Sequence, residues 1–248
     1  KTAISLYHVL EEKGREPQYD GYVESFTENW EKLERYDNNA PKTMNAHLHV
    51  LEAYTLLYQC WKDNGLKKRL EFCVDLFMNR IYDPSRRHFN LFFDNEWNSL
   101  VEMDSYGHDV ETGWLLCEAA RTLENQDLIE QTNQLALDVT EACLAEGMSD
   151  KGYMIYEKKG DRKTKHASWW GQVETMIACV NAWQISGDEA WLQSADTVWT
   201  FVKDHMVDKE YGEWYSDCFD GEPKKGAPKV SMWRCPYHTV RLGVEMYN

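Results

Sequence analysis

The chain has 248 residues, 43% of them apolar and 13% aromatic, so it is long enough to bury a sizeable core as a globular protein. Its 27 basic and 42 acidic residues give a net charge of −15, which disfavours nucleic acids and anionic membrane surfaces as partners. A neutral or cationic small molecule is the favoured partner. No apolar run reaches the roughly 18 residues of a membrane span, and no basic-then-apolar leader opens the sequence.

The seven cysteines are odd in number and form no CxxC pair, and most of them lie in apolar helical patterns. This usage is typical of buried free thiols in a reducing compartment. We therefore expect a cytoplasmic protein without disulfides.

Turn signals recur about 60 residues apart, which indicates an internal repeat. They are Asn64-Gly65, Asn125-Gln126-Asp127 and Ser186-Gly187-Asp188. Each repeat reads as an aromatic-rich helix, a tight turn, a second amphipathic helix and a long loop. The expected first helices are 42–63, 105–124, 167–186 and 235–247; the second helices are 66–80, 127–145 and 189–206; a further helix over 2–13 opens the chain.

The two helices of a repeat differ in their apolar pattern. The first helices are apolar around most of their circumference, as over 50–58, which predicts an inner ring. The second helices carry a one-sided stripe, as over 192–202, which predicts an outer ring. Short alternating segments in the long loops predict small β-hairpins over one mouth of the ring. The sequence thus predicts an all-α toroid of helix hairpins, one domain over 1–248, with its motifs around one cavity.

The first motif holds Asn45 and His49, four residues apart and therefore on one helix face. Together they could hydrogen-bond a sugar hydroxyl, or they could simply satisfy backbone and loop groups. His47 faces another direction, and we interpret it as structural.

The second motif holds His108 and Glu111, three residues apart on the next first helix. A nearby carboxylate raises the basicity of an imidazole and a helix N-terminus lowers it, so this histidine suits reversible proton transfer. The alternative is an ordinary helix start, with Ser105 as N-cap and acidic residues in the first turn.

The third and fourth motifs add aromatic rings. Trp170 and Glu174 lie four apart and could stack on and hydrogen-bond a sugar, although two core tryptophans at 169 and 170 are nearly as good an interpretation. Trp233 precedes Pro236, which fits the first position of a helix and places His238 in the first turn. The helix dipole would keep His238 neutral and able to act as a base.

Metal and cofactor chemistry is not indicated. The motifs contain no H-E-x-x-H, and their potential ligands are scattered singly over several helices. Gly-rich phosphate loops are also missing from the sequence. We expect no metal, nucleotide or redox cofactor.

Four segments together resemble the cellobiose 2-epimerase branch of the N-acylglucosamine 2-epimerase family, in the same order and at similar spacing from about Gly21 to the end. They are KTMNAHLHVLEAY from Lys42, SYGHDVETGWLL from Ser105, WWGQVE from Trp169 and WRCPYH from Trp233. The resemblance implies an (α/α)6 barrel. It also implies cofactor-free epimerisation at C2 of the reducing-end glucose or mannose of a β-1,4 disaccharide such as cellobiose or mannobiose.

The resemblance also implies roles for individual residues. His108 and His238 match the acid/base pair that removes and returns the C2 proton through an enediol, and either histidine could serve either face. Glu111 and Glu174 match carboxylates that bind hydroxyls or assist a histidine. Asn45 and His49 match residues that hold sugar oxygens, and Trp170 and Trp233 match aromatic walls of the site.

The chain departs from the family in length. Members have about twelve helices, whereas this sequence predicts about eight, so an N-terminal third containing an arginine and a tyrosine of the site is expected to be missing. An open ring would expose an apolar flank at 2–13 or 235–247 and favour self-association. The alternatives are an aldose–ketose isomerase or N-acylglucosamine 2-epimerase of the same family, an α/α-toroid glycoside hydrolase, and a non-catalytic carbohydrate-binding fragment.

Overall fold

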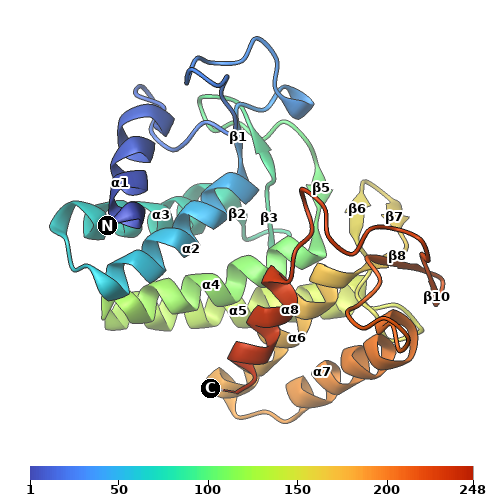
Figure 1. Cartoon of the computed structure of the whole chain (residues 1–248). Coiled ribbons are helices and arrows are strands. Elements are labelled where there is room, and N and C mark those ends of the chain that lie inside the picture. Colours follow the sequence, from blue (N-terminus) through green and yellow to red (C-terminus); the bar gives the residue numbers. More distant parts are fainter. Residues whose placement is uncertain (248) are drawn as a thin grey trace. The chain divides into compact units, whose positions relative to one another are not determined.

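The computed structural model describes residues 1–247 and is predominantly helical (Figure 1). Within these residues, eight α-helices occur where the turn signals and apolar patterns predict them. They are α1 (Thr2–Val9), α2 (Met44–Cys60), α3 (Asn64–Leu76), α4 (Tyr106–Leu123), α5 (Gln126–Gly147), α6 (Trp169–Ser186), α7 (Ala190–Phe201) and α8 (Tyr237–Glu245). Single π-helical turns extend three of them, at Leu10–Gly14, Phe77–Ile81 and Val202–Met206, and a 3-10 turn covers Asp37–Asn39. No helix in the described part of the chain has the length and apolar character needed to cross a bilayer.

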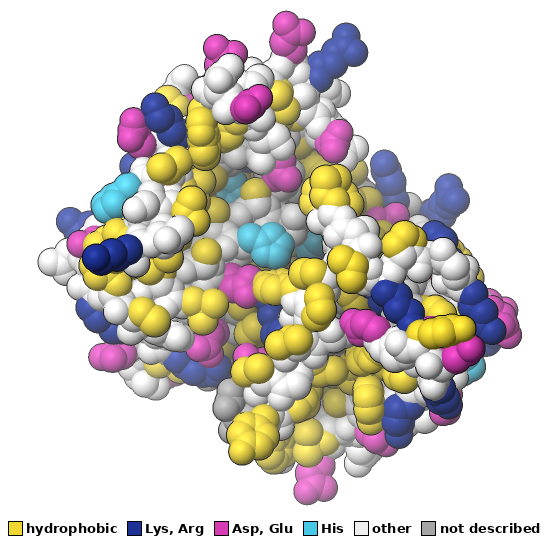
Figure 2. Space-filling model, viewed as in Figure 1, with side chains coloured by type: hydrophobic (Ala, Val, Ile, Leu, Met, Phe, Trp, Pro, Cys, Tyr) yellow, Lys and Arg dark blue, Asp and Glu magenta, His cyan; other side chains and the backbone are white. Residues whose placement is uncertain are grey.

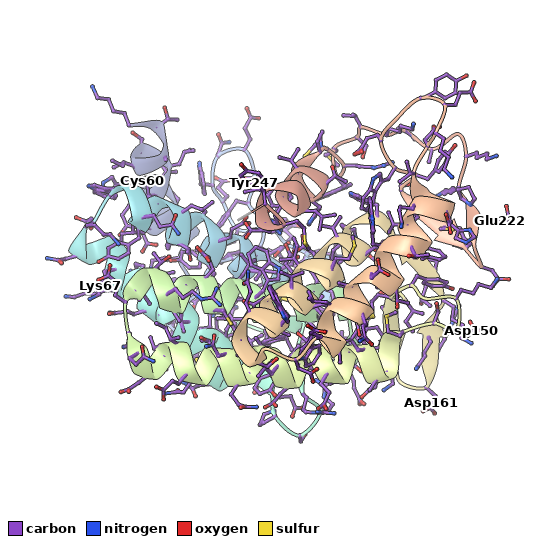
Figure 3. All side chains as sticks on the ribbon, turned by 90° about the horizontal axis from the view of Figure 1, so that it is seen from below. Cys60, Lys67, Asp150, Asp161, Glu222 and Tyr247 are labelled. Carbon is purple, nitrogen blue, oxygen red and sulfur yellow. The ribbon has the colours of Figure 1, made fainter. Side chains whose placement is uncertain are left out.

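The chain forms two compact units, Lys1–Met103 with Leu115–Glu130, and Asp104–Trp114 with Gln131 onward. In the first unit, α2 and α3 pack as a hairpin; Figure 3 labels Cys60 and Lys67 on the two sides of its turn. Asp63 caps α3 by accepting hydrogen bonds from the backbone amides of Gly65 and Leu66, which explains why the helix begins there.

A partly buried polar network holds the N-terminal helix of the first unit in place. Glu11 accepts hydrogen bonds from the hydroxyls of Tyr22 and Tyr54 at 2.6 and 2.5 Å. Arg69 on α3 pairs with Glu11 at 3.1 Å and with Asp20 at 3.1 Å. Because each charge has an opposite partner, this burial is tolerated.

The second unit is built on α6, which is buried along most of its length. Ser168 caps its start by accepting from the amide of Gly171, and Gly187 ends it in a left-handed conformation at φ 74°. Both α7 and α8 pack against α6. The sequence predicts an inner, largely buried helix over 235–247. Within this unit, however, α8 buries only Arg241. The sequence predicts Pro236 as the first residue of this helix. In the structure Pro236 is the N-cap, and α8 begins one residue later, at Tyr237.

Short strands occur in the loops between the helices, as predicted. They are β1 (Lys42–Thr43), β2 (Tyr82–Asp83), β3 (His88–Phe89), β4 (Phe92–Phe93), β5 (Met103–Asp104), β6 (Glu157–Lys159), β7 (Arg162–Thr164), β8 (His166–Ser168), β9 (Asp217–Phe219) and β10 (Glu222–Pro223). In the second unit β6 and β7 form a hairpin, and β9 lies between β8 and β10. Figure 3 labels Asp150, Asp161 and Glu222, which lie at one end of this unit.

Candidate active site

Three helix starts of the second unit bring together five of the eight predicted site residues. They are His108 and Glu111 on α4, Trp170 and Glu174 on α6, and His238 on α8. The repeat explains this convergence, because each first helix begins with its motif after a long loop.

Glu174 holds His238 through a direct hydrogen bond. Its Oε1 lies 2.6 Å from His238 Nδ1, and its Oε2 accepts from the indole nitrogen of Trp114 at 2.9 Å. Glu174 is fully buried, whereas the His238 side chain is 16% exposed. A carboxylate at Nδ1 favours the tautomer with hydrogen there, which makes Nε2 the ring atom that can accept a proton.

Arg241 bridges the two carboxylates of the site. Its Nη1 donates to Glu111 Oε1 at 2.7 Å and to Glu174 Oε1 at 2.9 Å. The guanidinium also lies over the rings of Trp114 and Tyr237, 5.2 and 4.2 Å from their centroids. One cation therefore compensates two buried acids, and its aromatic contacts fix its position.

Glu111 is a buried acid of the site whose pKa is shifted. It is almost completely buried, and its charged or titratable neighbours are Glu174, Arg241 and His238. Burial first, and then the negative charge of Glu174, raise the pKa of Glu111 from 4.5 to about 7, against the lowering effect of Arg241. Glu111 can therefore exchange a proton near neutral pH.

His108 and His238 both approach the ring of Trp170, with centroid separations of 4.5 and 5.8 Å. Ser105 directly precedes α4, its carbonyl accepts from the amide of Asp109 at 2.9 Å, and its Oγ lies 2.7 Å from His108 Nδ1. Gly107 makes room for the indole: a Cβ on it would lie 2.6 Å from a ring carbon of Trp170. The ring of Trp169 lies under Arg234, 5.1 Å from the guanidinium carbon, and its centroid is 6.3 Å from that of His238.

The other three predicted residues lie on α2 and in the loop before α8. Asn45 and His49 lie on α2 in the first unit, where His49 is 47% exposed and faces Glu52 at 3.5 Å. Trp233 lies in the loop before α8 and is 83% exposed. The interpretation of His47 as structural fits its contacts: it is buried, its Nε2 accepts from the amide of Tyr22 at 2.9 Å, and burial lowers its pKa to about 4.

A metal could in principle use the same cluster. Ligand atoms of Glu111, Glu174 and His238 lie within 4.8 Å of one another, a suitable spacing for a cation. The Arg241 guanidinium already lies against both carboxylates, and its positive charge opposes a second cation at that point.

The sequence analysis did not identify Arg241, Trp114 or the contact between Ser105 and His108. Two features of the sequence point to Arg241 and Trp114. Arg241 lies three residues after His238 and Trp114 three after Glu111, so each shares a helix face with a predicted site residue. In addition, two buried carboxylates require a nearby cation.

Comparison with known proteins gives consistent matches over almost the whole chain. The model of the N-acylglucosamine 2-epimerase (GlcNAc 2-epimerase) family matches residues 1–241. A cellobiose 2-epimerase of Bacteroides fragilis is 38% identical, with 98% of this chain and 64% of that protein covered. One of Dictyoglomus turgidum is 34% identical, with the same two coverages.

A solved structure supports the same assignment. The cellobiose 2-epimerase of Bacillus thermoamylovorans superposes with a TM-score of 0.93 at 35% identity, covering 98% of this chain and 64% of that one. This chain thus spans slightly less than two thirds of the length of these relatives. The family match, the sequence identity and the shared helical fold agree, and the chain belongs to the N-acylglucosamine 2-epimerase family.

Proposed function

We propose that this chain carries the acid/base machinery of a sugar 2-epimerase. The observation that carries the proposal is the approach of His108 and His238 to one indole, Trp170, with His238 held at Nδ1 by a buried carboxylate. An aromatic ring beside two proton-transfer groups suits a sugar that must lose and regain a proton on carbon. Cellobiose 2-epimerases among the relatives support the same chemistry.

The reaction needs proton transfer alone. One histidine takes the proton from C2 of the open-chain aldose, the C2–H electron pair forms a C1–C2 double bond, and the carbonyl oxygen gains a proton to give an enediol. Return of a proton to C2 from the opposite face, by the other histidine, inverts the centre, and the oxygen proton is released as the carbonyl re-forms. Either histidine can serve either face in this scheme.

Glu174 and Arg241 act in this scheme through His238 rather than on the sugar. Glu174 orients the imidazole, and Arg241 fixes Glu174 while compensating Glu111. This role is an alternative to the direct sugar contact predicted for Glu174. We assign Glu111 to proton exchange within the cluster, because its pKa lies near neutrality.

The proposed substrate is the reducing-end glucose or mannose of a β-1,4 disaccharide, cellobiose or mannobiose, within an (α/α)6-type barrel. Asn45, His49 and Trp233 are the proposed sugar contacts outside the cluster. The relatives' names support the disaccharide, and the helix hairpins of the two units support the barrel.

The two main alternatives differ in their support. An aldose–ketose isomerase would use the same enediol and reprotonate C1, so the site geometry suits it equally. A glycoside hydrolase needs two carboxylates flanking the scissile bond with space for a sugar or water between them. Glu111 and Glu174 are both buried and are bridged by one guanidinium nitrogen, which does not fit that arrangement.

Incubation of the protein with cellobiose, followed by chromatographic separation of the products, tests the proposal. We expect glucosyl-mannose as the main product, and the His238→Asn variant should form at least a hundredfold less. Ketose as the main product would identify an isomerase, and free glucose would identify a hydrolase. Either result, or no product, would contradict the epimerase assignment.

A further inference from the structure

The loop between β10 and α8 contains a tight turn that presents large apolar side chains to solvent. Two backbone hydrogen bonds close it: the amide of Ser231 donates to the carbonyl of Arg234 at 2.8 Å, and the amide of Arg234 donates back at 3.2 Å. Met232 is 85% exposed and Trp233 83%, whereas Arg234 is only 4% exposed. Figure 2 shows hydrophobic side chains on the surface of this loop, which leads into α8. We call residues 231–234 the Trp233 turn.

Arg234 anchors the Trp233 turn from inside the second unit. Its Nη2 donates to the backbone carbonyl of Trp214, and its Nη1 donates to that of Pro228 at 3.3 Å. Its guanidinium carbon also lies 5.1 Å from the ring centroid of Trp169, the first residue of α6. One side chain thus ties the turn to three separate segments of the same unit.

The burial of Arg234 is unfavourable for a residue that serves packing alone. Burial lowers the pKa of its guanidinium below the ordinary value. Among residues 1–247, no carboxylate forms an ion pair with Arg234, and its Nε is buried without an acceptor. Since a buried cation without an opposite partner is costly, a methionine of similar length would pack there more favourably. The two carbonyl contacts therefore indicate that Arg234 fixes a position.

The indole of Trp233 needs such an anchor to remain in water. An exposed aromatic ring gains free energy by folding back onto other apolar groups, and the exposed Val230 and Met232 lie next to it in the chain. Trp233 precedes His238 by five residues, so their Cα atoms are at most about 18 Å apart. This separation suits a ring that contacts the second sugar of a disaccharide whose reducing end lies at His238.

We propose that Arg234 is a positioning residue, which holds the Trp233 turn so that the indole stays exposed for the nonreducing sugar of the substrate. Arg234 acts through Trp233 and does not itself contact the sugar. Its effect on substrate binding rests on the proposed function, whereas its effect on the conformation of Trp233 does not. Loss of Arg234 should therefore weaken substrate binding and leave proton transfer intact.

Fluorine NMR measures the exposure of Trp233 without reference to catalysis. The protein is labelled with 5-fluorotryptophan, Trp233→Phe identifies the signal among the 11 tryptophans, and a soluble gadolinium chelate broadens the signals of exposed rings. We expect strong broadening in the wild type and about twofold less in Arg234→Met, because the released indole folds back. Arg234→Lys keeps a charged donor and should recover the wild-type signal. Arg162→Met removes an exposed arginine of β7 and is the matched control.

A double-mutant cycle tests whether Arg234 acts through Trp233. Arg234→Met should raise KM for cellobiose about fivefold or more and change kcat by less than about threefold. Trp233→Ala should raise KM at least as much. Adding Arg234→Met to Trp233→Ala should then change KM by less than about twofold, because the positioned ring is already absent.

Two results would overturn the proposal. One is an unchanged Trp233 signal in Arg234→Met, and the other is a further rise in KM when Arg234→Met is added to Trp233→Ala. If the wild type does not convert cellobiose, the proposed function is refuted, and the fluorine signal alone decides on Arg234. If Arg234→Met does not fold by circular dichroism, Arg234→Gln provides the test, because it keeps one amide donor but loses the cation over Trp169 and should show the same loss of broadening.

Discussion

Replacing Arg241 by methionine should destabilise the protein in a pH-dependent way. Methionine retains part of the packing against Trp114 and Tyr237, but it removes the positive charge that contacts both Glu111 and Glu174. Two buried carboxylates would then face each other with no bridging guanidinium.

The size of the effect depends on whether Glu111 is ionised. Breaking a buried ion pair by removing one partner costs about 3–5 kcal/mol, and we expect this loss at pH 8, above the pKa of Glu111. In the wild type the pKa of Glu111 is about 7 instead of 4.5, a difference equivalent to about 3 kcal/mol. The folded state thus binds more protons than the unfolded state between pH 4.5 and 7, and stability falls as the pH rises through this window.

Loss of Arg241 removes a pKa-lowering influence on Glu111, so the pKa should rise further and the fall in stability should extend to higher pH. At pH 5.5, where Glu111 is protonated, Arg241→Met should therefore cost clearly less than at pH 8. Adding Glu111→Gln to Arg241→Met should recover much of the loss at pH 8.

Urea denaturation followed by tryptophan fluorescence measures these free energies of unfolding at both pH values. Arg162→Met is the control, since Arg162 is exposed on β7 and should change stability by less than about 0.5 kcal/mol. An equal loss for Arg241→Met at pH 5.5 and pH 8, or the absence of rescue by Glu111→Gln, would show that the carboxylate pair is not what Arg241 stabilises.

Three further predictions follow from the same contacts. Glu174→Gln should lower kcat of the proposed epimerase about 10²–10⁴-fold with little change in KM, because it disturbs the tautomer and orientation of His238; steady-state kinetics would show otherwise if KM changed instead. Gly107→Ala places a methyl group 2.6 Å from a ring carbon of Trp170, and we expect a loss of about 1–3 kcal/mol in urea denaturation; wild-type stability would mean that the indole moves freely. A thiol reagent should modify two of the seven cysteines rapidly in the native protein, and more than two fast-reacting thiols would contradict the burial of the rest. The reactive pair is Cys60 and Cys235.

The sequence predicted the helices well because the signals are local. Asp63, Ser168 and Gly187 cap or end helices by hydrogen bonds and backbone conformations that depend on a few neighbouring residues. The recurring turns therefore give the helix order directly, and the motifs necessarily fall at helix starts. The single domain over 1–248, the cytoplasmic location and the lack of cofactors remain predictions.

The interior of the site could not be predicted from such signals. The bridge from Arg241 to Glu111 joins residues 130 positions apart, and the bond from Trp114 to Glu174 spans 60 positions. Apolar periodicity predicts that a helix has a buried face but not which helix covers it. For the same reason the sequence predicts an inner helix at 235–247, although α8 buries only Arg241 within its unit.

The central claim is that His108 and His238 transfer protons at C2 of a sugar, and deuterium exchange tests it most directly. Cellobiose and glucosyl-mannose are incubated in D2O with the wild type, His108→Asn and His238→Asn, and loss of the C2 proton signal is followed by NMR. We predict that the wild type exchanges and interconverts both sugars, while each variant loses net epimerisation yet exchanges C2 of one sugar, a different one for each variant. Retention of wild-type epimerisation by both variants would contradict the assignment and transfer the acid/base role to Glu111, Glu174 or His49.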